Sequence, residues 1–179
     1  YAQAADPADI ASLQADVVIG AQGKSQLAER IAAALDKKGA PQPMMPARSI
    51  HVFESLDIHA FSHQTRAFLK IQDGCNQFCS YCIIPYARGA ERSIAPAQAV
   101  SIARTMAEHG HQEIVLSGIH TGRYGRDQGT TLLQLLKQLI DATPEQVRYR
   151  ISSIEMNEID DAFIAYMKQE PRIARHLHI

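Results

Sequence analysis

From residue 65 onward, short apolar runs alternate with segments of helical length whose apolar residues share one face. The runs predict strands at 66–72, 113–118 and 147–154, and the segments between and after them predict helices at 96–110, 131–142 and 158–169. The last residues, 176–179, are apolar enough to begin a fourth strand. Strands separated by helices of this length pair in parallel through right-handed crossovers. The chain can therefore form an open doubly wound sheet or a (βα) barrel, where ligands gather at the carboxyl ends of the strands.

The first 40 residues predict one layer of a separate α/β unit. Asp6 followed by Pro7 is typical of a helix start. Residues 15–20 are a short apolar run that ends in glycine, as buried parallel strands often do. Residues 25–39 predict a helix that carries an apolar face and ends at a glycine.

A segment of different character joins these two parts of the chain. It contains three closely spaced prolines and lacks a sustained period, which predicts a linker. His51, His59 and His63 fall in it, and we expect them to be solvated rather than metal ligands. The expected organisation is part of an α/β domain at 1–40, a linker at 41–64 and a truncated barrel at 65–179.

Composition and charge exclude several classes of protein. The chain has 179 residues, 46% of them hydrophobic, and a formal net charge of -1, which argues against a chain-wide field for nucleic acid. No apolar run is long enough to span a membrane. The chain starts with Tyr1 and no signal-peptide pattern follows, so we interpret it as a piece of a cytoplasmic protein.

The three cysteines lie together in a C-x3-C-x2-C array, at Cys75, Cys79 and Cys82. An odd number at this spacing fits a disulfide framework poorly, whereas thiolates suit iron–sulfur clusters and zinc. Three sulfurs on a cubane cluster leave one iron open to a small chelating ligand. A zinc site with three cysteines and one histidine is an alternative, but the nearest upstream histidine is a whole predicted strand away. An electron-transfer cluster, the third possibility, would normally bring a fourth cysteine.

Longer motifs add a family resemblance. The segment "GCNQFCSYCIIPYARGAERS", followed by "EIVLSGIHTGRYG" and "RISSIE", resembles the radical S-adenosylmethionine (SAM) methylthiotransferases. The "GIHTGRYG" loop favours the branch that acts on threonylcarbamoyladenosine in tRNA over the isopentenyladenosine-tRNA and ribosomal-protein branches. The resemblance covers essentially the whole chain. It implies an incomplete radical SAM (βα) barrel, preceded by the C-terminal remnant of an α/β methylthiotransferase N-terminal domain.

The resemblance also implies an activity and its cofactors. A 4Fe–4S cluster on Cys75, Cys79 and Cys82 would cleave SAM, and the enzyme would insert a methylthio group into threonylcarbamoyladenosine next to the anticodon. A second 4Fe–4S cluster is expected in the full-length protein, but its ligands are absent here, so we expect this chain alone to be incomplete for turnover. The implied partners are tRNA and a reducing electron donor such as a flavodoxin or ferredoxin, with no membrane. Ile94 stands where the family usually has arginine.

Further candidate site residues lie in or after the loops that follow the predicted strands. Polar groups at the loop ends and nearby arginines are suited to hold SAM, and a glycine can leave room for it. The alternatives are that these residues pack within the loop, form a turn or are solvated at the surface. The SAM candidates are Tyr81, Arg88, Arg92, Gly118, Ser153 and Glu155. The candidates for reading the nucleotide are His120, Arg123 and Tyr124. The residues expected near the same face for phosphate contact are Arg66, Lys70, Arg88, Arg92, Arg123 and Arg126, and His178 could point into the barrel mouth.

Overall fold

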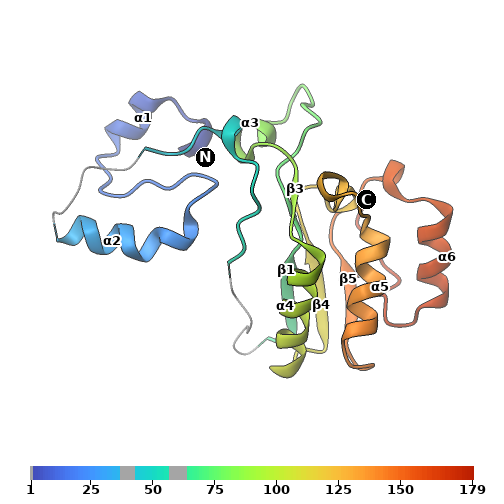
Figure 1. The fold of residues 1–179 in the computed structure, drawn as a ribbon. Helices are drawn as coiled ribbons and strands as arrows, with labels where there is room; N and C mark the ends of the chain where they lie inside the picture. Colours follow the sequence, from blue (N-terminus) through green and yellow to red (C-terminus); the bar gives the residue numbers. More distant parts are fainter. Residues whose placement is uncertain (1, 37–42, 57–63) are drawn as a thin grey trace. The chain divides into compact units, whose positions relative to one another are not determined.

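The structure is a computed structural model that describes residues 2–36, 43–56 and 64–179, which divide into two compact units (Figure 1). The first unit contains residues 1–56 together with 74–91, and the second contains 57–73 together with 92–179. The cysteine segment therefore belongs to the first unit, while the chain on both sides of it belongs to the second. The predicted domain boundaries at residues 40 and 64 border segments outside the described residues, so they stay predictions.

A parallel sheet forms the centre of the second unit. Strands β1 (Arg66–Lys70), β4 (Glu113–Ser117) and β5 (Arg148–Ile151) lie in the order β1-β4-β5. Both pairs are parallel, with Ala67 opposite Ile114 and Ile114 opposite Tyr149. This confirms the predicted strands and their direction. The three strands form an open sheet, as expected for an incomplete barrel.

Three helices accompany the sheet in the predicted places: α4 (Pro96–Glu108), α5 (Leu132–Ala142) and α6 (Asp161–Gln169). Figure 1 shows α4 and α5 running alongside the strands. The buried faces of these two helices supply Ile102, Met106, Leu135, Leu136 and Leu139 to the core. Alternate residues are buried in β1 and β5, whereas three consecutive residues are buried in the central strand β4. Thr131 starts α5 with a capping box, which explains why this helix begins where the sequence predicted.

The end of the chain continues the sheet in a looser form. Two isolated parallel bridges join Tyr149 to Ile173 and Ser153 to His178. Residues 173–178 therefore run parallel beside β5 without becoming a regular strand. The predicted start of a fourth strand at 176–179 has the right place and direction.

A two-residue antiparallel pair flanks the cysteine segment. Its strands are β2 (Gln72–Asp73) and β3 (Arg92–Ser93), with Asp73 opposite Arg92. The predicted strand 66–72 is thus divided, because β1 ends at Lys70 and Gln72 pairs with another partner.

The described part of the first unit is helical, with no β-strand. Helix α1 (Pro7–Ser12) starts at Asp6, whose side chain accepts from the Ala8 N–H, so this prediction is confirmed. Helix α2 (Leu27–Leu35) follows a 3₁₀ turn, η2 (Lys24–Gln26). The predicted strand at 15–20 is wrong: these residues are non-helical, and the described chain offers them no strand partner. Strand propensity acts only where a neighbouring strand supplies hydrogen bonds.

Short elements complete this unit. They are the 3₁₀ turns η1 (Ala2–Ala4) and η3 (Ala47–Ser49) and helix α3 (Ile84–Arg88), which contacts both turns. Gly39, His59 and His63 lie outside the described residues, and His51 is exposed. None of the described helices is long and apolar enough to cross a membrane.

Candidate functional site

The cysteine segment leaves β2 and carries three free thiols. Cys75 is buried, Cys82 is half-buried and Cys79 is exposed. The Cys82 N–H donates to the Cys79 carbonyl at 2.9 Å, which places these two residues in one turn. The Gln77 N–H donates to the Cys75 sulfur, with the nitrogen and sulfur 3.4 Å apart.

Backbone contacts close the base of this segment. Gly74 has a φ of +73°, and a Cβ atom added there would lie 1.9 Å from the Ala90 carbonyl oxygen, so only glycine fits. The Cys75 N–H donates to the Gly89 carbonyl at 3.1 Å. The Glu91 N–H donates to Asn76 Oδ1 at 3.2 Å. The first cysteine is therefore held at a fixed backbone position, while the other two lie farther along the segment.

The donor set fits an iron–sulfur cluster, since all three cysteines are free and belong to one short segment. In the described residues, however, no three His, Cys, Asp or Glu side chains are gathered closely enough to hold a metal ion. The side chains around the cysteines are exposed, among them Phe78, which has a φ of +47°, and Tyr81, which is 91% exposed. Metal binding commonly organises ligands that are not preformed, so this segment can close when a cluster binds.

In the second unit, the loop after β4 packs against β2. A Cβ atom at Gly118 would come within 3.0 Å of the Gln72 Cβ atom, so glycine permits the close approach of the two segments. The buried Gln72 side chain accepts a hydrogen bond from the His120 N–H at 2.8 Å. This contact fixes the backbone of the loop at His120.

The same loop is tied to β3 and the residue after it. The Tyr124 hydroxyl donates to the Ile94 carbonyl at 3.0 Å, and burial raises the pKa of Tyr124. Ser93 exchanges hydrogen bonds with three neighbouring residues of the loop, Gly125, Asp127 and Gln128. Ile94 is itself buried, so the residue that departs from the family pattern belongs to the core here.

On its other side, this loop meets the loop after β5. His120 Nε2 lies 2.8 Å from Glu158 Oε1, and both side chains are almost completely buried. Glu155, whose side chain is 60% exposed, has its Oε1 atom 3.7 Å from the same nitrogen. Burial raises the pKa of Glu158, and the neighbouring His120 opposes that shift. The Thr121 and Ser152 hydroxyls, 3.3 Å apart, form a second link between the loops.

The other predicted site residues have different surroundings. Arg92 is buried, with its Nη2 atom 3.0 Å from Asp73 Oδ2. Ser153 is exposed and its hydroxyl lies 3.1 Å from His178 Nδ1. Arg123 is half-buried, and its N–H donates to the His120 carbonyl at 3.0 Å.

The structure thus brings several predicted residues together and separates others. The group at the carboxyl ends of β4 and β5 comprises Gly118, His120, Arg123, Tyr124, Ser153 and Glu155. Tyr81 and the half-buried Arg88 lie with the cysteines in the first unit. Sequence reasoning missed Gln72, Asp73 and Glu158. Two polar residues at the end of an apolar run were a usable signal for Gln72 and Asp73, whereas nothing near Glu158 marks it in the sequence.

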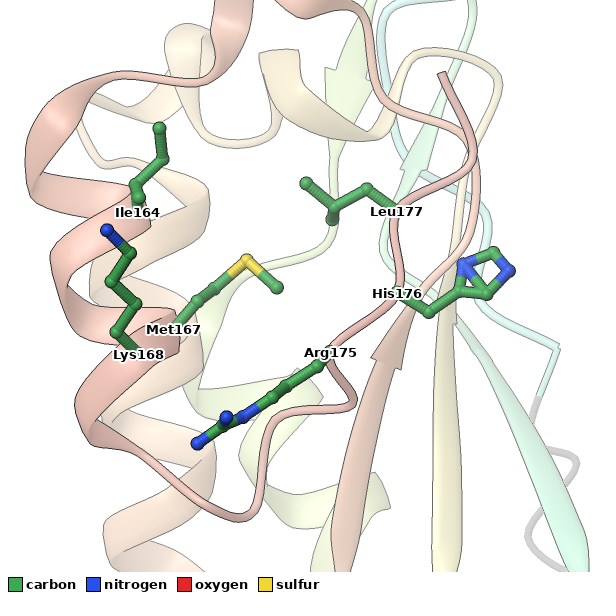
Figure 2. Close-up of a pocket in the computed structure, with 6 residues that line it drawn as sticks. All are labelled: Ile164, Met167, Lys168, Arg175, His176 and Leu177. Carbon is green, nitrogen blue, oxygen red and sulfur yellow. The ribbon is translucent and has the colours of Figure 1, made fainter.

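A pocket of about 370 Å³ lies elsewhere in the second unit, between α6 and the end of the chain. Figure 2 shows Met167 and Leu177 pointing toward each other across it, with Arg175 extending toward α6 below them and the His176 ring pointing away from both. None of the predicted site residues lines this pocket.

Comparison with known proteins gives a consistent result. The sequence profile of the radical SAM superfamily matches residues 69–179. The chain is 40% identical to threonylcarbamoyladenosine tRNA methylthiotransferase MtaB of Bacillus subtilis (strain 168), over 100% of this chain and 40% of the relative. It is 32% identical to the Thermotoga maritima protein of that name, over 97% of this chain and 39% of the relative.

A relative with a different name also matches. The tRNA-2-methylthio-N(6)-dimethylallyladenosine synthase of Anaeromyxobacter sp. (strain Fw109-5) is 30% identical over 92% of this chain and 35% of the relative. The chain therefore spans about two fifths of the length of the curated relatives named first.

Proposed function

This chain belongs to the radical SAM superfamily, and we propose that Cys75, Cys79 and Cys82 hold the 4Fe–4S cluster with which it cleaves SAM. Membership of the superfamily implies both SAM and such a cluster. The observation that carries the proposal is the set of three cysteines in one short segment, which follows the first parallel strand β1 and leaves the sheet from β2. Three thiolates leave one iron of a cubane open for the amino and carboxylate groups of SAM.

When bound, the cluster supplies the electron that cleaves a sulfur–carbon bond of SAM, and the protein supplies orientation and exclusion of water. The exposed Glu155 carboxylate and the Ser153 hydroxyl are suited to accept hydrogen bonds from SAM, and Gly118 leaves room beside the strand end. Tyr81 and Arg88 belong to the cysteine segment and would act from there. Arg92 is held by Asp73, so its part would be to support the segment rather than to touch SAM.

We propose that the whole protein is a tRNA methylthiotransferase that acts on threonylcarbamoyladenosine. The two relatives that match nearly all of the chain carry that name, which supports the proposal. Within the candidate substrate residues, Arg123 would contact the nucleotide, while His120 and Tyr124, both buried, would shape the same loop. The exposed Arg126 is available for phosphate contact. Arg66 was expected on the same face, but it begins β1 at the amino end of the sheet, where its Nε atom lies 2.8 Å from Glu113 Oε1.

The proposal includes further components of the whole protein. They are a second 4Fe–4S cluster, whose ligands would lie outside this chain, and a reducing donor of the flavodoxin or ferredoxin type. The isopentenyladenosine-tRNA and ribosomal-protein branches are alternatives, and the dimethylallyladenosine synthase at 30% identity keeps the first of them open. A non-catalytic zinc or iron–sulfur module is the alternative from another class.

Metal analysis after anaerobic reconstitution tests the cluster. We expect about four irons per chain at this site, with the absorbance of a 4Fe–4S cluster, and loss of that iron in Cys79→Ser. Ser80→Ala is a matched control, because Ser80 is exposed in the same turn but offers no thiolate. One zinc and no iron would show a structural module instead.

Turnover tests the reaction and the substrate. Reduction of the loaded protein with dithionite in the presence of SAM should yield methionine and 5′-deoxyadenosine, and their absence would contradict SAM cleavage. The full-length protein should then methylthiolate tRNA that carries threonylcarbamoyladenosine. Product formed only on isopentenyladenosine-containing tRNA, or only on a ribosomal protein, would identify one of the other branches.

A further inference from the structure

We propose that His120 and Glu158 are positioning residues that hold the Glu155 carboxylate in place for SAM. This inference rests on the proposed function and assigns the buried pair a role in the same site. Glu155 is the exposed carboxylate of the group, whereas the His120 and Glu158 side chains are 4% and 3% exposed. Because the buried His120 and Glu158 side chains cannot reach a bound ligand, they would act on SAM through Glu155.

His120 is fixed from the side of β2. Its N–H donates to Gln72 Oε1 at 2.8 Å, and Gln72 is fully buried. The Gln72 side chain in turn donates to the Asp73 carbonyl at 3.1 Å, which defines the direction of its amide group. Gly118 lets the loop approach Gln72 closely enough for these contacts. The imidazole of His120 therefore projects from a backbone position with little freedom.

Glu158 is enclosed between two parts of the loop after β4. One carboxylate oxygen lies 2.8 Å from His120 Nε2. A Cβ atom added at Gly122 would lie 2.2 Å from the other oxygen, Oε2, and 2.8 Å from the Glu158 Cβ atom, so glycine is required at this position. The space beside Gly122 is shaped for this carboxylate.

Glu155 is held at two points by this pair. Its N–H donates to Glu158 Oε2 at 3.4 Å, and its side chain accepts from the Glu158 N–H, which together form the capping box of the turn η6 (Met156–Glu158). The Glu158 N–H also donates to the Glu155 carbonyl at 3.0 Å. The Glu155 carboxylate lies 3.7 Å from His120 Nε2. Glu158 thus restrains the backbone and the side chain of Glu155 through the capping box, and His120 Nε2 lies within ion-pair distance of both carboxylates while that of Glu155 stays open to solvent.

A carboxylate restrained in this way suits the chemistry of SAM. Ionised carboxylates accept hydrogen bonds from hydroxyl and ammonium groups, and SAM carries a ribose diol and an ammonium group. Preorganisation of the acceptor lowers the entropy lost on binding. The cost of losing His120 should therefore appear in SAM affinity, and it should depend on Glu155 being present.

The test is a double-mutant cycle on SAM affinity in the full-length protein with its cluster loaded. We expect His120→Gln and Glu155→Gln each to raise the Kd for SAM by about tenfold, the size of one well-placed charged hydrogen bond. The double variant should bind SAM only slightly more weakly than Glu155→Gln alone, because His120 acts through Glu155. Glu158→Gln, which keeps the shape of the side chain, should weaken binding less than Glu158→Ala.

A control and two outcomes make the test decisive. His111→Gln removes a buried histidine before the amino end of β4, and it should lower the unfolding free energy without changing SAM affinity at unchanged iron content. If His120→Gln, like the control, lowers the unfolding free energy and leaves SAM affinity unchanged, the positioning role is overturned. The same holds if its effect on the Kd for SAM adds fully to that of Glu155→Gln. If wild-type protein with a loaded cluster neither binds nor cleaves SAM, the proposed function fails instead.

Discussion

Asp73 and Arg92 face each other across β2 and β3, with Arg92 Nη2 3.0 Å from Asp73 Oδ2 and both side chains no more than 2% exposed. The chain passes from Asp73 directly into the cysteine segment and returns from it directly into Arg92. A buried ion pair therefore joins the two ends of the segment that carries all three cysteines. Lys70 adds a second positive charge to the same carboxylate oxygen.

Asp73→Asn should destabilise the protein strongly. Removing one charge of a buried pair leaves the other buried in a low dielectric, which costs about 3 kcal/mol or more. Because the pair joins the ends of the cysteine segment, we also expect faster loss of iron from the reconstituted protein to a chelator. Denaturant unfolding and the rate of iron release measure the two effects.

The partly buried ion pair between Glu113 and Arg150 provides the matched comparison, since it joins the same kinds of charge at the amino end of β4. Glu113→Gln should cost no more than about 1 kcal/mol and leave iron release unchanged. Equal effects of the two substitutions would contradict a special role for Asp73.

Tyr124→Phe should lower the free energy of unfolding by about 1 kcal/mol, because the buried Ile94 carbonyl loses the hydrogen bond from the tyrosine hydroxyl. Since Tyr124 is 1% exposed, we expect tRNA affinity to stay unchanged. Chemical denaturation and a tRNA-binding titration check the two parts. Weaker tRNA binding at unchanged stability would show direct contact with the nucleotide.

Local patterns explain which parts of the fold were predictable. The helices from residue 96 onward follow from Pro96 and the Thr131 capping box together with helical periodicity, all of which act within a few residues. The strand predicted at 15–20 failed because a strand needs a neighbour, and no local pattern supplies one.

The candidate site shows the same difference between features set by local patterns and features set by long-range contacts. The spacing of the cysteines predicts a metal or cluster site without any tertiary information, and this assignment stays a prediction. The hydrogen bond from His120 to Gln72 spans 48 positions in the sequence, so no short motif encodes it. The buried pairs Arg92–Asp73 and Glu158–His120 also form only when segments distant in the sequence meet. Sequence reasoning therefore predicted that these loops follow the strands, but not which of their polar residues are buried.

The Glu113 ion pair should make stability depend on acid pH. Hydrogen bonding from Arg150, aided by the charges of Arg150 and Arg66, lowers the pKa of Glu113 below 4.5 although partial burial opposes this. Its contribution is therefore fully present above the unfolded pKa and is lost as pH falls through the lowered folded value. The difference in unfolding free energy between wild type and Glu113→Gln should be largest near about pH 7 and shrink toward about pH 3. An exposed control, Glu145→Gln, should show little difference at either pH.

Gly122→Ala tests the space beside Glu158 without changing any charge. The added methyl group would lie 2.2 Å from Glu158 Oε2 and 2.8 Å from its Cβ atom, so the side chain must move and we expect a loss of about 2 kcal/mol in unfolding free energy. In a Glu158→Ala background part of this loss should disappear, because the carboxylate is removed while the Cβ atom at 2.8 Å remains. Gly129→Ala separates sterics from backbone strain: it meets nothing within 4 Å but has a φ of +68°, so its cost of about 1 kcal/mol should persist in both backgrounds. A Gly122→Ala penalty that persists unchanged in the Glu158→Ala background would place the conflict in the backbone instead.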